Sequence, residues 1–224
     1  MKLDGLKLYH FFRSSSSWRV RWVLRLKGID CAFEHIDLAT GDAHEDAYLA
    51  MNPLAQVPVL ELKGERFSHL TETVAMLEWL DETVPEPCRL MPDDSMLRAR
   101  ARQLVEIINA NIHALQNIST FRKHSDDEDE QQAWCQFWVG RGLKAYEAYV
   151  AETAGTYSMG DVLSMPDIYL VPICENAVRF GVDLAETPTV KRIYETARAT
   201  DACRWAEPDG WMPEGWAPPQ AQAA

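Results

Sequence analysis

The stretch Tyr9–Arg21 reads YHFFRSSSSWRVR and joins a strand pattern to a helix pattern through a polar corner. The helix pattern begins near Trp18 and stops at Lys27, before a glycine. Four serines lie at the helix entrance, where serine side chains accept hydrogen bonds from backbone N–H groups. These donors and the helix dipole favour an anion such as a thiolate or a carboxylate. The stretch is therefore either an anion-binding helix start or a plain serine-rich cap.

The first half of the chain alternates strand patterns with helix patterns. The expected strands are 6–11, 33–38 and 57–62, with a tight turn at 63–64 that leads into a fourth at 65–67. The expected helices are 18–27, about 45–51 and 71–83. A βαβ unit followed by a short helix, a hairpin and a helix is the thioredoxin-like arrangement.

Pro58 lies at the start of a strand that should be inside this sheet, where proline is rarely tolerated. Most bonds before proline are trans. Thioredoxin-like proteins, however, have a cis bond before the proline at this place, which presents the preceding backbone to a ligand. The arrangement therefore predicts a cis bond between Val57 and Pro58.

After Pro92 the strand patterns disappear and only helix patterns remain. Helices are expected over about 96–118, 125–152 and 165–180, and a shorter one begins at Pro188. The proline-rich segment before them is typical of a linker. The sequence thus predicts a thioredoxin-like α/β domain at 1–84, a linker at 85–92, an all-α domain at 93–206 and an irregular tail at 207–224.

The 224-residue chain is acidic, with a formal net charge of −12. This charge argues against nucleic acid and anionic membranes as partners, because phosphate groups bind to basic surfaces. No apolar run approaches the roughly 18 residues that span a bilayer, and the N-terminus lacks the apolar core of a signal peptide. Five scattered cysteines without a C-x-x-C pair argue against a disulfide framework and a metal site. We expect a cytoplasmic protein.

Four motifs follow one another along the chain. They are Arg13–Arg21, Asn52–Leu60, Leu70–Leu80, and Gly160-Asp161 with a capping box from Ser164 to Asp167. Together they resemble the zeta-class glutathione transferases, the maleylacetoacetate isomerases, whose first motif is Ser-Ser-Cys, any residue, an aromatic residue and Arg-Val-Arg. This chain has Ser16 where the family has cysteine, and Thr73 where it has serine. The resemblance covers the chain except its tail and implies the glutathione transferase fold.

The resemblance implies that the first domain binds glutathione as a cofactor. Glu72 is expected to pair with the γ-glutamyl amine, and Thr73, at the start of its helix, to hold the adjacent carboxylate. Without the resemblance, Glu72 is equally a carboxylate that complements a helix dipole. Ser14 is the main candidate for the hydroxyl that bonds the sulfur, and Ser15 is the second.

The remaining glutathione contacts come from two other segments. Val57, just before Pro58, is expected to offer its N–H and C=O to the cysteinyl part, as one strand pairs with another. Gln56 is expected at the glycyl end. Gln116 is expected to reach glutathione across a dimer interface.

The resemblance also implies the reaction, in which the glutathione thiolate adds to a cis enone dicarboxylate, the former double bond rotates and the thiolate leaves. Arg13 and Arg179 are expected to hold the substrate carboxylates, because arginine binds carboxylates with two parallel hydrogen bonds. Without the resemblance, Arg179 is equally a cation at a helix C-terminus. Arg21 and Arg25 lie four residues apart and are expected on a solvated helix face.

Two other functions stay open. One is a general glutathione transferase that adds glutathione permanently to electrophiles, for which the serine at 16 leaves room. The other is a non-catalytic binding protein that keeps the fold. A glutaredoxin-like reductase is excluded, because none of residues 13–18 is cysteine. The resemblance also implies a homodimer, with aromatic residues of the second half, such as Trp134, Phe137 and Trp138, as interface or core.

Overall fold

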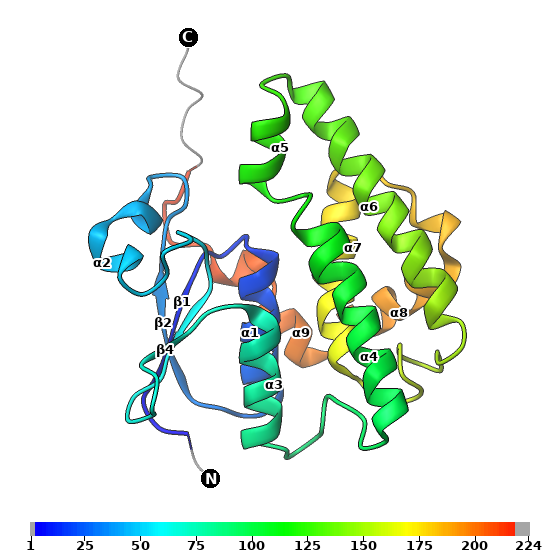
Figure 1. Ribbon diagram of the computed structural model, residues 1–224, viewed down its shortest axis with the longest axis horizontal. Coiled ribbons are helices and arrows are strands. Elements are labelled where there is room, and N and C mark those ends of the chain that lie inside the picture. The colour runs from blue at the N-terminus through cyan, green and yellow to red at the C-terminus, as the bar shows by residue number, and fades with distance from the viewer. Residues whose placement is uncertain (1–2, 218–224) are drawn as a thin grey trace. The chain divides into compact units, whose positions relative to one another are not determined.

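A computed structural model describes residues 3–217, which divide into two compact units (Figure 1). The first unit combines the chain up to Cys88 with the chain from Asp201 onward, and the second runs from Arg89 to Thr200. The first contains β1 (Leu6–His10), α1 (Ser15–Leu26), β2 (Cys31–His35), η1 (Asp42–His44), α2 (Asp46–Leu49), β3 (Val59–Glu61), β4 (His69–Leu70), α3 (Thr73–Thr83), α9 (Asp201–Ala206) and η4 (Pro208–Trp211). The second contains α4 (Ser95–Ile108), η2 (Asn109–His113), α5 (Ile118–His124), α6 (Glu128–Val150), α7 (Met165–Arg179), η3 (Leu184–Glu186) and α8 (Pro188–Arg198).

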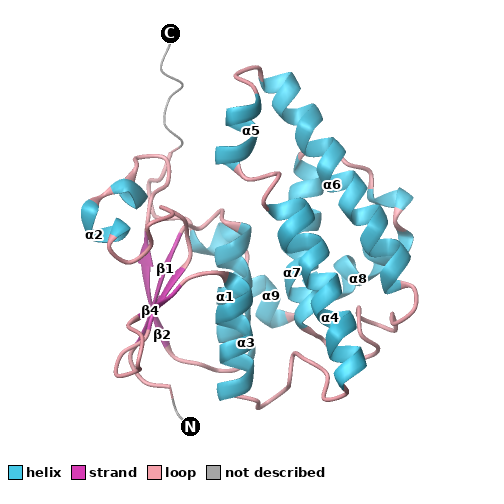
Figure 2. Cartoon of the chain, viewed as in Figure 1, coloured by secondary structure: helices cyan, strands magenta, loops and turns pink. Residues whose placement is uncertain are grey.

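The sheet of the first unit has the order β2-β1-β3-β4. Its strands are magenta in Figure 2. β1 pairs with β2 in parallel and with β3 antiparallel, and β4 is antiparallel to β3. α1 and α3 pack together on one face. The other face carries a buried cluster of Tyr9, Ile36, Ala43, Tyr48 and Val59 beneath α2. This confirms the thioredoxin-like α/β domain followed by a helical one.

α1 begins at Ser15, earlier than the apolar spacing predicts, because Ser14 caps the helix and the other three serines form its first turn. The helix is buried from Ser15 to Leu24, so apolar spacing alone does not mark its start. It ends where Gly28 takes a φ of +61°, a conformation that glycine adopts without a steric penalty.

The second strand of the hairpin is shorter and later than predicted. It is β4, His69–Leu70, and not 65–67. The backbone N–H of Leu62 donates to the carbonyl of Ser68 at 2.8 Å, so the exposed loop between them replaces the predicted tight turn. A two-residue strand carries no alternation that a sequence pattern can detect.

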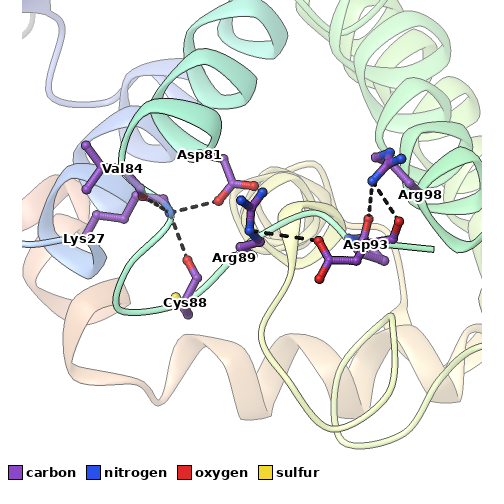
Figure 3. A network of polar contacts seen from close by, with 8 residues as sticks. Lys27, Asp81, Val84, Cys88, Arg89, Asp93 and Arg98 are labelled. Carbon is purple, nitrogen blue, oxygen red and sulfur yellow. Dashed lines mark hydrogen bonds and ion pairs between the residues drawn. The ribbon is translucent and has the colours of Figure 1, made fainter. Parts of the chain in front are cut away.

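Lys27 joins the ends of α1 and α3 through a buried ion pair (Figure 3). Its Nζ lies 2.8 Å from a carboxylate oxygen of Asp81, and the two side chains are 0% and 3% exposed. The same Nζ donates to the carbonyls of Val84 at 2.7 Å and Cys88 at 2.9 Å. The Lys27 ammonium thus holds the end of α1 against α3 and against the chain that follows α3.

α7 is the central helix of the second unit, buried along almost its whole length. Its start is held by Asp167, which is fully buried and accepts from the backbone N–H of Ser164, the Ser164 hydroxyl and the backbone N–H of Ser158, at 2.8, 2.7 and 2.8 Å. The predicted capping box is therefore present. The predicted long helix over 96–118 ends instead at Ile108, and a π-helical turn follows.

The C-terminal residues depart from the predicted domain boundaries. α9 packs against α1 and belongs to the first unit, whereas the sequence assigned residues up to 206 to the helical domain. Arg21, expected in solvent, is fully buried, and it donates to the carbonyl of Ala206 at the end of α9. Part of the expected tail is also ordered as η4, and residues 218–224 lie outside the described part. None of the helices in residues 3–217 is both long and apolar enough to cross a membrane.

Candidate active site

Three segments of the first unit meet at one edge of its sheet, where β1 and β4 end and β3 begins. β1 runs toward this edge and leads into Ser14. β3 is antiparallel to β1 and pairs Val59 with Tyr9, so the residues before Val59 start from the same edge. β4 is antiparallel to β3 and therefore leads Glu72 and α3 back to it. The strand order and directions thus place three predicted site residues, Ser14, Val57 and Glu72, at the same edge of the sheet.

Ser14 has the geometry of a helix cap whose hydroxyl can still donate. Its backbone is extended, with φ −68° and ψ 120°, and its Oγ accepts from the backbone N–H of Ser17 at 3.1 Å. A serine hydroxyl has one donor and two acceptor positions, so this bond leaves the O–H free to point at a bound anion. The first turn of α1 contains no acidic residue that would repel such an anion.

The four serines differ in burial and therefore in the roles open to them. Ser14 is half-buried, Ser15 and Ser16 are each 8% exposed, and Ser17 is 0% exposed. The Oγ of Ser17 accepts from the backbone N–H of Phe11 at 3.4 Å, which gives it a structural role. Arg13, just before the cap, is exposed.

The segment before β3 presents a backbone edge. The Val57–Pro58 bond is cis, as predicted. Within residues 3–217 no backbone hydrogen bond is made by Val57, whose side chain is half-buried, while Gln56 is exposed. An N–H and a C=O with free hydrogen-bonding positions suit an extended, peptide-like ligand.

Two side chains that the sequence analysis did not assign hold this edge in place. The hydroxyl of Tyr48 and the Nδ2 of Asn52 both donate to the carbonyl of Gln56, each at 2.8 Å. Asn52 also accepts from the backbone N–H of Leu54 at 3.1 Å. The Asn-Pro dipeptide at 52–53 is a turn signal that could have pointed to Asn52, but nothing in the sequence marks Tyr48.

Glu72 has a strained backbone at the start of α3. Its φ is +62° and its ψ 112°, in a region that residues other than glycine rarely adopt. Its side chain makes no capping hydrogen bond and is exposed, and the next residue, Thr73, is buried in the first turn. Strain of this kind costs about 1–3 kcal/mol and is concentrated at ligand-binding positions.

The two predicted site residues of the second unit have different surroundings. Gln116 is buried, and its Oε1 accepts from Asn176 Nδ2 at 3.1 Å, while its Nε2 lies 3.4 Å from His113 Nδ1. Arg179, the last residue of α7, is exposed, with its guanidinium 5.1 Å from the centre of the Phe180 ring. Of these two side chains, Arg179 is exposed and Gln116 is buried within the unit.

Comparison with known proteins agrees with the fold and the motifs. The family model of the glutathione S-transferase N-terminal domain matches residues 13–83. The maleylacetoacetate isomerase of Rattus norvegicus is 38% identical over 203 residues, which cover 90% of this chain and 91% of the relative.

Two solved structures are similar over nearly their whole length. One is a holo maleylpyruvate isomerase described as a bacterial zeta-class glutathione transferase, with a TM-score of 0.86, 36% identity and coverage of 93% of this chain and 99% of the other. The other is maleylacetoacetate isomerase from Anaeromyxobacter dehalogenans with glutathione bound in its active site, with a TM-score of 0.83, 40% identity and coverage of 92% and 95%. The chain belongs to the glutathione transferases and, among them, to the zeta-class family of maleylacetoacetate isomerases.

Proposed function

We propose that this protein is a glutathione-dependent cis–trans isomerase of a maleyl-type dicarboxylate, converting maleylacetoacetate to fumarylacetoacetate. The observation that carries the proposal is the Ser14 hydroxyl, which caps α1 and keeps its donor position at the sheet edge shared by Val57 and Glu72. The names of the relatives support the same reaction. Such an isomerase takes part in the breakdown of aromatic amino acids.

The groups at this edge match the parts of glutathione. The Glu72 carboxylate complements the γ-glutamyl amine, and Thr73 at the start of α3 complements the adjacent carboxylate. Val57, preceding Pro58, complements the amide groups of the cysteinyl part. Gln56 and Gln116 complete the proposed glutathione contacts, at the glycyl end and from a second subunit.

Bound glutathione supplies a thiolate that adds reversibly to the substrate double bond. Ser14 stabilises this anion by donating its O–H, with Ser15 as the neighbouring hydroxyl. Lowering a thiol pKa from about 8.5 to about 6.5 raises the thiolate fraction at pH 7 from roughly 3% to roughly 75%, while nucleophilicity falls roughly eightfold. The net gain is a few-fold, so most of the rate must come from positioning and from stabilising charge on the substrate.

Arginine side chains hold the substrate. Arg13 and Arg179 are both exposed and can reach small anions, and each guanidinium fits a carboxylate. Each is proposed to pair with a carboxylate of the substrate. Ser16, in place of the family cysteine, is buried in the first turn of α1, which favours packing as its role.

Maleylpyruvate is a second candidate substrate. The similar structure with a TM-score of 0.86 is a maleylpyruvate isomerase, and maleylpyruvate is also a cis enone dicarboxylate. The same serine and arginine groups serve both substrates.

A homodimer in the cytoplasm is part of the proposal. Phe137 of α6 is 61% exposed, and it contacts Trp138, which in turn contacts Trp134. Trp134 and Trp138 are half-buried, and a partly exposed aromatic row of this kind is typical of an interface. All five cysteines are free, which fits a reducing compartment.

The test is the purified protein with maleylacetoacetate and glutathione well below the substrate concentration, followed by the absorbance of the trans product. We expect complete conversion with no loss of free thiol. Maleylpyruvate is assayed in parallel to rank the substrates. Conjugation to a chloroaromatic compound without any isomerisation would show a general transferase instead.

A further inference from the structure

The chain beyond η4 returns to the loop that carries the active-site serines. The indole of Trp216 lies 4.7 Å from the Phe12 ring, between centroids, at an interplanar angle of 72°, and 6.3 Å from the Phe11 ring. Its Nε1 donates to Asp37 Oδ2 at 2.9 Å. Both phenylalanines are buried, at 8% and 3% exposure for Phe11 and Phe12. Trp216 thus packs on the residues directly before Arg13 and Ser14.

The backbone of this loop determines where the Ser14 hydroxyl lies. The Ser14 N–H donates to the Phe11 carbonyl at 3.1 Å, and the Phe11 N–H donates to Ser17 Oγ at 3.4 Å. Arg21 also donates to the carbonyl of Phe12 at 3.1 Å. A shift of either phenylalanine therefore moves the cap of α1.

The other end of the Trp216 contact is also fixed. Asp37 follows β2, and its second carboxylate oxygen accepts from the backbone N–H of Ala39 at 2.9 Å. The indole is thereby held at its nitrogen by the loop after β2 and at its ring by the loop after β1. One side chain links two neighbouring loops at the edge of the sheet where the site lies.

We propose that Trp216 is a positioning residue for the active site, which holds Phe12 and through it the orientation of the Ser14 hydroxyl. This inference rests on the proposed function, because the hydroxyl is the group that faces the glutathione sulfur. Trp216 does not touch the reacting atoms. Loss of the Trp216 side chain should lower kcat/KM for glutathione, although no group that binds glutathione is removed.

The experiment compares Trp216→Leu with Trp205→Leu. Trp205 belongs to the same C-terminal segment, but its ring contacts are Trp211, Phe33 and Arg25, at 4.8, 6.2 and 5.3 Å. A merely structural role of the segment would affect both variants alike. Trp216→Phe keeps a ring against Phe12 and loses the bond to Asp37, so it provides a milder variant if Trp216→Leu does not fold.

The first measurement is amide hydrogen exchange in the protein without ligand. Trp216→Leu should speed exchange of the Ser14 and Ser17 amides, Trp216→Phe should do so less, and Trp205→Leu should leave both unchanged. Equal exchange at these amides in Trp216→Leu, Trp216→Phe and the wild type overturns the inference. This readout does not depend on glutathione.

The second measurement is kinetic. Because a misplacement of about 1 Å can cost on the order of 100-fold in rate, we expect about a tenfold lower kcat/KM for glutathione in Trp216→Leu. The pH profile of thiolate absorbance should also shift upward, since the hydroxyl no longer faces the sulfur. Equal losses in Trp205→Leu overturn the inference. If the wild type neither binds glutathione nor isomerises, the proposed function fails, and the exchange comparison still decides whether Trp216 holds the loop.

Discussion

The Nε and the Nη2 of Arg21 both donate to the carbonyl oxygen of Ala206, at 3.1 and 2.9 Å. The same guanidinium donates to the Phe12 carbonyl and lies 3.2 Å from His10 Nδ1. A fully buried cation is stable only when hydrogen bonds replace its water shell. Arg21 thus connects α1, the loop that contains Phe12 and the C-terminal segment.

Replacing Arg21 by lysine should destabilise the protein, because lysine lacks the planar fork that reaches these acceptors together. We expect a loss of about 2–3 kcal/mol in urea unfolding, since hydrogen bonds to charged groups contribute about 1.5–3 kcal/mol each. Arg25→Lys, four residues away and exposed, is the matched control and should change stability by less than about 0.5 kcal/mol. An equal loss of stability in Arg21→Lys and Arg25→Lys would contradict a role for the planar guanidinium of Arg21.

The Lys27–Asp81 pair predicts a large cost when only one partner is removed. Lys27→Met removes the buried cation that pairs with the Asp81 carboxylate and donates to two carbonyls, so we expect a loss of about 3–5 kcal/mol in unfolding free energy. Lys7→Met removes the partner of Glu34, whose pair is 35% and 49% exposed, and should cost less than about 1 kcal/mol. A small effect at Lys27 would show that water reaches the pair.

His10 predicts a pH dependence of stability. Burial, then the nearby Arg21 cation and His35, lower the pKa of His10 to about 3. Above pH 6.5 the ring is neutral in both folded and unfolded chains, so the full stability is present. Below pH 6.5 only the unfolded chain gains the proton, and stability falls until about pH 3.

Urea unfolding between pH 7 and pH 4 measures this effect against His10→Gln, which keeps a hydrogen-bonding side chain and cannot titrate. The wild type should lose up to about 1.4 kcal/mol per pH unit more than the variant below pH 6.5. Parallel curves for the two proteins would show that His10 does not carry the dependence.

Two substitutions of Glu72 should have the same effect on glutathione affinity and different effects on protein stability. Glu72→Ala and Glu72→Gly both remove the carboxylate proposed to pair with the γ-glutamyl amine, so calorimetry should give about tenfold weaker glutathione binding, the equivalent of about 1.4 kcal/mol. Only glycine relieves the φ of +62°, so Glu72→Gly should be more stable than Glu72→Ala by about 1 kcal/mol. Unchanged affinity in both variants would refute the assignment.

Replacing Arg179 should change the KM for the dicarboxylate substrate and no binding constant for glutathione. Arg179→Ala should raise the KM for maleylacetoacetate about tenfold and leave the Kd for glutathione unchanged, because Arg179 is proposed to pair with a substrate carboxylate and not with glutathione. Arg66→Ala is the control, since Arg66 likewise lies over the ring of the following residue, at 5.5 Å from its centre. A weaker glutathione affinity in Arg179→Ala would contradict the role.

The sequence predicts best what depends on neighbouring residues. The βαβ start, a serine cap at the entrance of the first helix and the capping box at Ser164 follow from spacings of a few positions, and all are present. The burial of Arg21 could not be predicted, because its acceptor lies 185 residues away in Ala206. β4 and α5 are too short to show a period, and Tyr48 gains its role only when the chain folds back on Gln56.

The division of the chain has a consequence for its synthesis. Residues up to Cys88 complete their unit only with residues from Asp201 onward, and the whole helical unit is translated between the two parts. At the ribosome, the buried Arg21 lacks its Ala206 acceptor until the second unit has already emerged. The helical unit is therefore free to fold first, and the unit that contains α1 is completed last. A gene fragment that stops at Cys88 would lack this final piece, whereas one that joins Cys88 directly to Asp201 would contain it.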